Sequence, residues 1–192
     1  MGKARQERWL EKRAAFEAVV AKHEAALLRY VARILRDADA AQDVVQDTFL
    51  KLFRRWNDVV KPGANLSTWL YRVAHNEAVD CIRKRQRRQA LHFRQSEERR
   101  TLQTHAAPAP FGETSGREKV RQALDALDLR ERQVVLLKVY EEKSYRDIAD
   151  IAGLSVGNVG YILHHALKKM AAQLTNGKVS TGNEDHEKTE TG

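Results

Sequence analysis

Apolar residues recur at intervals of three and four positions through most of this sequence, which is the spacing of one face of an α-helix. In the N-terminal half this spacing predicts one helix or two short ones over residues 16–35, then helices over 40–56 and from 67 or 68 to 88. The segment 61–65 reads Lys-Pro-Gly-Ala-Asn, whose composition is typical of a loop. We therefore expect a four-helix N-terminal domain over residues 16–88.

The helical pattern stops between residues 89 and 116, where Ala-Ala-Pro-Ala-Pro-Phe-Gly at 106–112 is incompatible with a continuing helix. This stretch predicts a flexible linker to a second helical domain over residues 117–174. Residues 1–15 are a charged N-terminal extension whose Trp9 and Leu10 could touch the body of the protein. Residues 175–192 are polar and lack aromatic side chains, the profile of a disordered tail. The predicted fold class is all-α, with two small helical domains.

The second domain ends in two helical patterns that meet at Gly153. Ser144 and Asp147 predict a capping box before the first of these helices, and Ser155 predicts the cap of the second. This arrangement predicts a helix-turn-helix whose second helix reads a DNA groove, although the spacing alone also fits an ordinary helical hairpin. The expected core residues are Val134, Val135, Leu136, Leu137 and Val139, with Val159, Ile162, Leu163, Ala166, Leu167 and Met170 on the inward face of the second helix.

Composition favours a polyanionic partner. The 192 residues include 34 Lys and Arg against 26 Asp and Glu, a formal charge of +8. Such an excess favours nucleic acid first and an anionic membrane surface second. Cys81 is the single cysteine, so no internal disulfide can form, which agrees with a reducing cytosol. The sequence starts without the apolar core of a signal peptide and has no membrane-spanning apolar run, so we expect a cytoplasmic protein without membrane insertion.

Two charged stripes lie on predicted helices. Asp39, Asp43 and Asp47 follow at i, i+4 and i+8 on the helix over 40–56, away from an apolar face made of Val45, Phe49, Leu52, Phe53 and Trp56. An acidic stripe stands out in a basic protein, but a solvated helix face has the same pattern, with Asp39 and Asp43 favouring the positive end of the helix dipole. By itself the stripe identifies no function.

The second stripe is basic and polar. Between residues 71 and 88 there are six basic residues against two acidic ones, and Arg72, Asn76, Asp80 and Arg83 form an outer stripe. These groups can hydrogen-bond to phosphates and to base edges, and concentrated positive charge favours docking on a phosphate backbone through counterion release. A solvated helix end without a partner is the alternative interpretation.

Three segments in this order carry a family resemblance: AQDVVQDTFLKLF at 41–53, STWLYRVAHNEAVDCIR at 67–83, and YRDIA at 145–149 followed by LSVGNV at 154–159. They resemble the motifs of the extracytoplasmic-function (ECF) group of bacterial sigma factors, the promoter-recognition subunits of RNA polymerase. The resemblance implies a transcription initiation factor that directs promoter recognition and strand opening, with core RNA polymerase and promoter DNA as partners. It also implies a monomer when free of polymerase. Family members are often held inactive by an anti-sigma factor, which is therefore a candidate partner.

The resemblance also assigns roles to residues. The face that grips the coiled coil of the largest polymerase subunit would contain Asp43, Gln46, Asp47 and Lys51. The −10 promoter element would be opened and one unstacked base held in a pocket that the loop at 61–66 supplies. The residues expected to contact the −10 element are Lys61, Asn65, Leu66, Arg72, Asn76, Asp80, Arg83 and Lys84.

The second helix of the helix-turn-helix would lie in the major groove of the −35 element. The residues expected to face DNA there are Ser155, Gly157, Asn158, Tyr161, His164, His165 and Lys168. Family members commonly carry basic residues in the middle of this helix, where Tyr161, His164 and His165 stand in this sequence. Because neutral imidazoles contribute little counterion release, Lys168 and Lys169 must supply much of the phosphate attraction.

Two rival functions fit less of the sequence. A helix-turn-helix regulator that acts as a dimer without polymerase leaves the acidic stripe unexplained, and no leucine-rich dimer seam is evident. An enzyme would need features that the sequence lacks, such as histidines at metal-ligand spacing, a phosphate-binding glycine loop or a nucleophile elbow. We therefore expect no catalytic activity, no cofactor and no metal.

Overall fold

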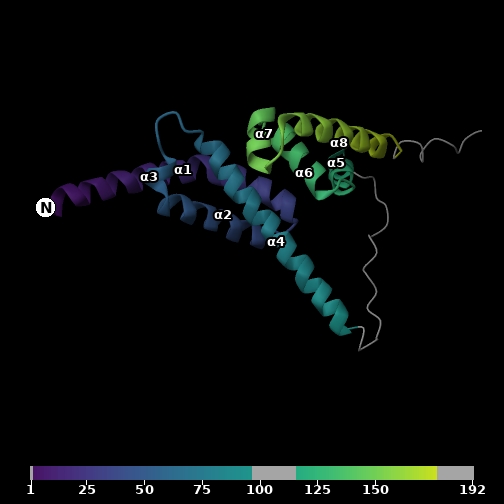
Figure 1. The fold of residues 1–192 in the computed structure, drawn as a ribbon, viewed down its shortest axis with the longest axis horizontal. Coiled ribbons are helices and arrows are strands. Elements are labelled where there is room, and N and C mark those ends of the chain that lie inside the picture. Colours follow the sequence, from purple (N-terminus) through teal and green to yellow (C-terminus); the bar gives the residue numbers. More distant parts are fainter. Residues whose placement is uncertain (1, 97–115, 177–192) are drawn as a thin grey trace, which may run out of the picture.

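The computed structural model describes residues 2–96 and 116–176. Within these ranges the chain forms eight α-helices, one π-helical turn and no strand, which confirms the all-α prediction (Figure 1). The N-terminal domain contains α1 (Gly2–Leu35), α2 (Ala38–Arg54), α3 (Trp56–Val59) and α4 (Leu66–Ser96). The C-terminal domain contains α5 (Gly116–Asp125), α6 (Leu129–Val135), the π-helical turn η1 (Leu136–Tyr140), α7 (Tyr145–Ala152) and α8 (Val156–Asn176). Residues 97–115 of the predicted linker and the predicted tail from residue 177 lie outside the described residues.

Helix α1 is a single helix, so the alternative of two short helices over 16–35 is wrong. Its buried residues Leu27, Tyr30 and Val31 face α2 and α4 and form the centre of the N-terminal core. The first half of α1 projects from the body (Figure 1). Trp9 and Leu10 are each 51% exposed there.

Helix α2 begins after Asp37, whose carboxylate accepts a hydrogen bond from the backbone N–H of Ala40 (3.0 Å). Its apolar face packs on α1, and aromatic rings meet at one part of this contact: the ring centre of Phe16 lies 6.4 Å from that of Phe49 and 5.2 Å from that of Phe53. The expectation that Phe53 points inward is only partly right, because the side chain is 36% exposed at the rim of this cluster. The ammonium of Lys12 lies 4.5 Å from the centre of the Phe53 ring.

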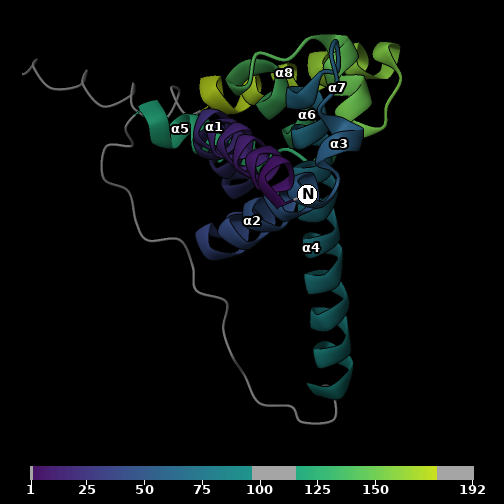
Figure 2. The same ribbon diagram turned by 90° about the vertical axis from the view of Figure 1, so that its left-hand side faces the viewer.

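Helix α4 differs from the prediction at both ends. It begins at Leu66 because the side-chain oxygen of Asn65 accepts a hydrogen bond from the backbone N–H of Thr68 (3.0 Å) and so caps the helix. It continues beyond residue 88 to Ser96, because residues 89–96 contain neither proline nor glycine and are mostly good helix formers. Figure 2 shows the C-terminal half of α4 extending away from both domains. A loss of apolar residues therefore marks the edge of the core, not the end of the helix.

The C-terminal domain contains a change of helical register that the sequence pattern missed. Helix α6 starts with a complete capping box between Asp128 and Glu131 and then passes into η1, where the backbone N–H of Glu141 reaches the carbonyl of Leu136 (3.2 Å). This π-helical bond rotates the following side chains relative to an α-helix. Val139 is consequently 54% exposed, so its assignment to the core is wrong, whereas Leu136 and Leu137 are fully buried as expected.

The helix-turn-helix is present as α7 and α8. Ser144 caps α7 by accepting a hydrogen bond from the N–H of Asp147 (3.1 Å), but the reciprocal half of the expected capping box is replaced by a bond from the Ser144 hydroxyl to the Asp147 carboxylate (2.6 Å). Along α8, Val159, Leu163 and Ala166 are buried as expected. Leu167 is 45% exposed, so its inward assignment is wrong, because it lies at the edge of the face that packs on α5 and α6.

Gly153 forms the turn between α7 and α8 with φ +65° and ψ +42°, in the left-handed region. Replacing it with alanine adds no clash, since nothing lies within 4 Å of the new Cβ, but it places an L-residue in a disfavoured conformation. We expect Gly153→Ala to lower the free energy of unfolding by about 1 kcal/mol, measured by urea denaturation. Gly157→Ala, at an equally open position in the first turn of α8, is the matched control and is expected to be neutral or slightly stabilising. Equal effects of the two substitutions would contradict this account of the turn.

The two domains lie side by side: α7 packs against the N-terminal part of α4, and η1 and α6 approach α1 (Figures 1 and 2). The sequence predicted independent domains on a flexible connection, and it gave no sign of this contact. Part of the contact is polar, and hydroxyls, carboxylates and ammonium groups that meet across domains leave no apolar periodicity in a sequence.

Candidate nucleic-acid and partner interfaces

The acidic stripe is an open surface of α2. Asp43, Gln46 and Asp47 are exposed, while Val44, Val45 and Thr48 between them are buried against the domain. Neither Asp43 nor Asp47 forms an ion pair with the part of the chain that the structure describes. Leu50 continues this face and is 45% exposed. Leu50 is not among the residues predicted to bind polymerase, although an apolar residue outside the apolar periodicity of α2 is a signal for an interface.

Lys51 differs from the other residues expected to bind polymerase. It is half-buried, and its ammonium forms an ion pair with the carboxylate of Glu77 on α4. The pair ties α2 to α4 within the N-terminal domain. Its contribution to stability is small because both side chains are partly exposed to water.

The loop expected to hold a −10 base is exposed from Lys61 to Asn65, with Gly63 at φ +78° permitting its tight turn. Asn65 is engaged at both ends of its amide: the oxygen caps α4, and the nitrogen donates to the carboxylate of Asp147 on α7 (3.1 Å). Leu66 is half-buried as the first residue of α4. One predicted DNA-contacting side chain is therefore held by the opposite domain.

The outer stripe of α4 is exposed at every position that the sequence analysis selected: Arg72, Asn76, Asp80, Arg83 and Lys84. Asp80 and Arg83 form an ion pair of 3.6 Å on the helix surface. Asn76, Asp80 and Arg83 also line a groove of about 820 Å³ whose other wall is α6. This part of the stripe therefore lies opposite the C-terminal domain.

His75 lies behind this stripe, with 5% of its surface exposed. Its Nδ1 is 3.0 Å from the hydroxyl of the fully buried Tyr30. Burial lowers the pKa of His75 from 6.5 to about 4, so the ring is neutral near pH 7. The residue is thus a structural partner of α1 inside the domain, not a group available to DNA.

Every residue expected to contact the −35 element is exposed on α8 or at its start: Ser155, Gly157, Asn158, Tyr161, His164, His165 and Lys168. Tyr161 is 66% exposed, and its ring lies 4.2 Å from that of His165. Lys169 is different, because its ammonium pairs with the buried carboxylate of Glu131 (2.5 Å). The hydrogen bond to Glu131 raises the pKa of Lys169, and the pair offsets part of the lysine's positive charge. The phosphate attraction expected of both lysines is therefore left mainly to Lys168.

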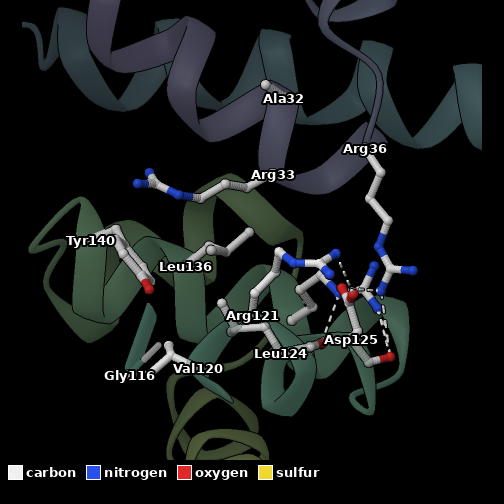
Figure 3. Close-up of a pocket in the computed structure, with 11 residues that line it drawn as sticks. Ala32, Arg33, Arg36, Gly116, Val120, Arg121, Leu124, Asp125, Leu136 and Tyr140 are labelled. Atoms are coloured by element: carbon white, nitrogen blue, oxygen red, sulfur yellow. Dashed lines mark hydrogen bonds and ion pairs between the residues drawn. The ribbon is translucent and has the colours of Figure 1, made fainter. Parts of the chain in front are cut away.

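A cavity of about 870 Å³ lies between α1 and the start of the C-terminal domain, and it contains a cluster of arginines (Figure 3). The guanidinium groups of Arg36 and Arg121 converge on the carboxylate of Asp125 at 2.5 and 3.4 Å. Arg33 lies over the ring of Tyr140, 4.2 Å from its centre. These contacts join the two domains at a second place, away from α4 and α7.

Two further properties limit the chemistry of the described residues. They contain no cluster of three or more His, Cys, Asp or Glu side chains arranged to hold a metal ion. Among the helices seen in ranges 2–96 and 116–176, none has the length and apolar character needed to cross a membrane.

These features define a class of protein: a two-domain helical protein with an open acidic face in one domain and a helix-turn-helix in the other. Residues 19–88 match the Sigma-70 region 2 family model, and residues 117–170 match the Sigma-70 region 4 model. The chain is 31% identical over 138 residues to the ECF RNA polymerase sigma factor EcfG of Rhodopseudomonas palustris, covering 72% of this chain and 73% of the relative. It is 29% identical over 150 residues to the RNA polymerase sigma factor YlaC of Bacillus subtilis, covering 78% and 86%.

A solved structure has a similar fold. The sigma factor RpoE of Bartonella quintana, crystallised with the anti-sigma factor NepR, matches with a TM-score of 0.65 and 25% identity, covering 84% of this chain and 97% of that one. The chain belongs to the ECF family of RNA polymerase sigma factors. Its function is that of a transcription initiation factor, which binds core RNA polymerase and promoter DNA.

Proposed function

We propose that the sigma-factor function is divided among three surfaces of this chain. Asp43, Gln46 and Asp47 on α2 bind core polymerase, together with Leu50. The loop at 61–66 and the outer stripe of α4 bind the −10 element, and the exposed face of α8 binds the −35 element.

The observation that carries the proposal is the exposure of Asp43 and Asp47 on one face of α2 while the opposite face is buried. Two carboxylates without ion-pair partners in the described residues leave a negative surface in a protein of charge +8. Such a surface repels DNA and favours a basic protein partner. The exposed Leu50 beside it supplies apolar contact area, as the centre of a protein interface does.

The DNA-facing surfaces have the opposite character. Arg72, Arg83 and Lys84 supply positive charge on α4, while Asn76 and Asp80 supply hydrogen-bonding groups for base edges. Strand opening costs a few kcal/mol, which stacking and hydrogen bonds to the freed base offset. On α8, Asn158, Tyr161 and His164 are the proposed readers of the −35 element, with Lys168 on a phosphate.

The proposal extends to location and regulation. A protein that acts on RNA polymerase works in the cytoplasm and needs no catalytic group or cofactor of its own. The structure of RpoE contains an anti-sigma factor, and its similarity to this chain supports a regulator of that kind here. We propose that the free protein is a monomer.

A run-off transcription assay with core polymerase and candidate promoters tests the function directly. We expect Asn76→Ala and Asp80→Ala each to reduce open-complex formation roughly tenfold or more, because a base contact is worth about 1–3 kcal/mol. Binding of core polymerase should be unchanged, because both side chains lie on α4 and not on the acidic face. Permanganate reactivity of unpaired thymines measures the opening step.

Gln89→Ala is the matched control for these two substitutions, since Gln89 is exposed on α4 beyond the proposed contact surface. It should leave opening unchanged. If Asn76→Ala and Asp80→Ala both open promoters as well as the wild type does, the assignment of the −10 surface to α4 is wrong.

A further inference from the structure

We propose that a groove beside the first turns of α1 binds single-stranded DNA next to the −10 element. The groove has a volume of about 1170 Å³ and lies between the projecting part of α1 and the short helix α3 (Figure 1). Its main lining residues are Arg5, Arg8, Trp9 and Lys12 from α1 and Trp56 and Asn57 from α3. The position on the promoter rests on the proposed function of the loop at 61–66, whereas the affinity of the groove for a single strand does not.

The projecting part of α1 precedes the segment that matches the Sigma-70 region 2 model, because that match begins at residue 19. It is helical because residues 3–18 contain neither proline nor glycine and are mostly good helix formers. None of the three proposed surfaces includes it. A helix that extends past its own domain exposes side chains that the core does not need, and these side chains are available to a partner.

The groove-lining residues of α1 share one side of the helix. Arg5, Arg8 and Lys12 follow at i, i+3 and i+7, and Trp9 stands one turn after Arg5. Arg5, Arg8 and Trp9 are exposed, and Lys12 is half-buried. Among the described residues that line the groove, Glu11 is the single carboxylate against these three cations. The groove therefore has an excess of positive charge, which attracts a polyanion.

The charge of Lys12 is held in place without being neutralised. Its ammonium donates a hydrogen bond to the backbone carbonyl of Phe53 (3.2 Å) and lies 4.5 Å from the centre of the Phe53 ring. Neither of these partners carries a negative charge, and Lys12 forms no ion pair within the described part of the chain. An ammonium group has three donors, so Lys12 can also donate to a phosphate oxygen in the groove.

Two tryptophans supply flat apolar surfaces in the groove. Trp56 is half-buried and packs on Phe16, whose ring centre lies 5.9 Å away. Trp9 is 51% exposed, and the guanidinium of Arg13 lies 5.7 Å from the centre of its ring. Sites that bind single strands combine positive charge with aromatic rings, because every base has a face that can stack. In a duplex the base faces stack on one another, so these rings favour a single strand.

The groove adjoins the loop that is proposed to hold a −10 base. Trp56 and Asn57 line the groove, and α3 ends at Val59, two residues before Lys61 at the start of that loop. Figure 1 shows the loop beside α3, at the end of the N-terminal domain from which α1 projects. A strand whose base is held by the loop can therefore continue along α3 into the groove.

The affinity of the free, full-length protein for a short fluorescein-labelled thymidine oligonucleotide tests the groove without polymerase or a promoter. Fluorescence anisotropy measures this affinity at a series of salt concentrations. We expect Trp9→Ala to raise Kd about fivefold or more, which is the loss of one stacked base. The double variant Arg5→Gln/Lys12→Gln should lower the slope of log Kd against log salt concentration by about 1.4, because each phosphate contact on a single strand contributes about 0.7.

Two substitutions outside the groove are matched controls. Leu10→Ala removes an apolar side chain that is 51% exposed, as Trp9 is, but does not line the groove. Lys22→Gln removes an exposed cation farther along α1. Both should leave Kd and its salt dependence unchanged. Trp9→Phe keeps an aromatic ring and should restore most of the affinity that Trp9→Ala loses, and circular dichroism verifies that each variant folds.

Photo-cross-linking tests the position of the groove on the promoter. Benzoylphenylalanine at Asn57, on the α3 side of the groove, should label the opened strand next to the −10 element in a complex with polymerase. Equal oligonucleotide affinities of the wild type and Trp9→Ala would overturn the groove as a single-strand site. Labelling of polymerase alone from Asn57 would overturn its position on the promoter. Normal promoter opening by Asn76→Ala and Asp80→Ala would overturn the proposed −10 surface, while weaker oligonucleotide binding by Trp9→Ala would still support the groove.

Discussion

Reversing the charge of Asp47 is expected to abolish association with core polymerase and all promoter-directed transcription. Asp47 is exposed in the middle of the acidic face, so an arginine there would place a positive charge against the basic partner surface that the proposal requires. Like charges brought together in an interface cost several kcal/mol, which corresponds to a loss of more than about 100-fold in affinity. Surface plasmon resonance with immobilised core polymerase measures the change.

The fold of the Asp47→Arg variant should be intact, because the side chain makes no ion pair with the described residues and surface substitutions of this kind change stability little. Glu24→Arg reverses an exposed acidic charge on α1 and is the matched control. It should bind polymerase normally. If the Asp47→Arg variant binds core polymerase with the affinity of the wild type, the assignment of α2 to the polymerase interface is wrong.

Acidification is expected to destabilise the N-terminal domain through His75. Burial lowers its pKa in the folded protein to about 4 from 6.5, so between these pH values the unfolded chain binds a proton that the folded chain does not. The stabilising contribution is fully present above about pH 6.5 and is lost as the pH falls toward 4. The shift corresponds to a loss of up to about 3 kcal/mol, measured by urea denaturation at a series of pH values.

The variant His75→Gln separates this effect from the titration of carboxylates. It removes the titrating ring while keeping a polar side chain near the hydroxyl of Tyr30. The variant should be less stable than the wild type near neutral pH and should show a shallower dependence on pH below 6.5. If the free energy of unfolding depends on pH with the same slope in both proteins, groups other than His75 cause the acid sensitivity.

Much of the fold could be predicted from the sequence because apolar residues at helical spacing mark the helix faces that are buried. The spacing predicted the buried positions Leu52, Val134, Val159 and Leu163 in this way. The failures have a common cause. Val139 was misplaced because η1 breaks the α-helical period, and Leu167 because spacing cannot tell the centre of a buried face from its edge.

The sequence predicted which residues of the candidate site are exposed, but it did not predict which of them contact other side chains. Asp43, Asp47 and the residues of α8 proposed to face DNA are exposed, as their place outside the apolar stripes requires. The pairing of Lys51 with Glu77 and of Lys169 with Glu131 could not be read from the sequence, because each pair joins helices that are distant along the chain. The same limit applies to the hydrogen bond between Thr68 and Asp147, which joins the two domains.

The acidic face of α2 is proposed to contact polymerase, and the exposed face of α8 is proposed to contact DNA. Photo-cross-linking from these faces in one initiation complex tests both contacts most directly, with benzoylphenylalanine placed in turn at Asp43 and at Tyr161. We expect the probe at Asp43 to label the largest polymerase subunit and not DNA, and the probe at Tyr161 to label the −35 region of the promoter. Labelling of promoter DNA from Asp43 would contradict the account.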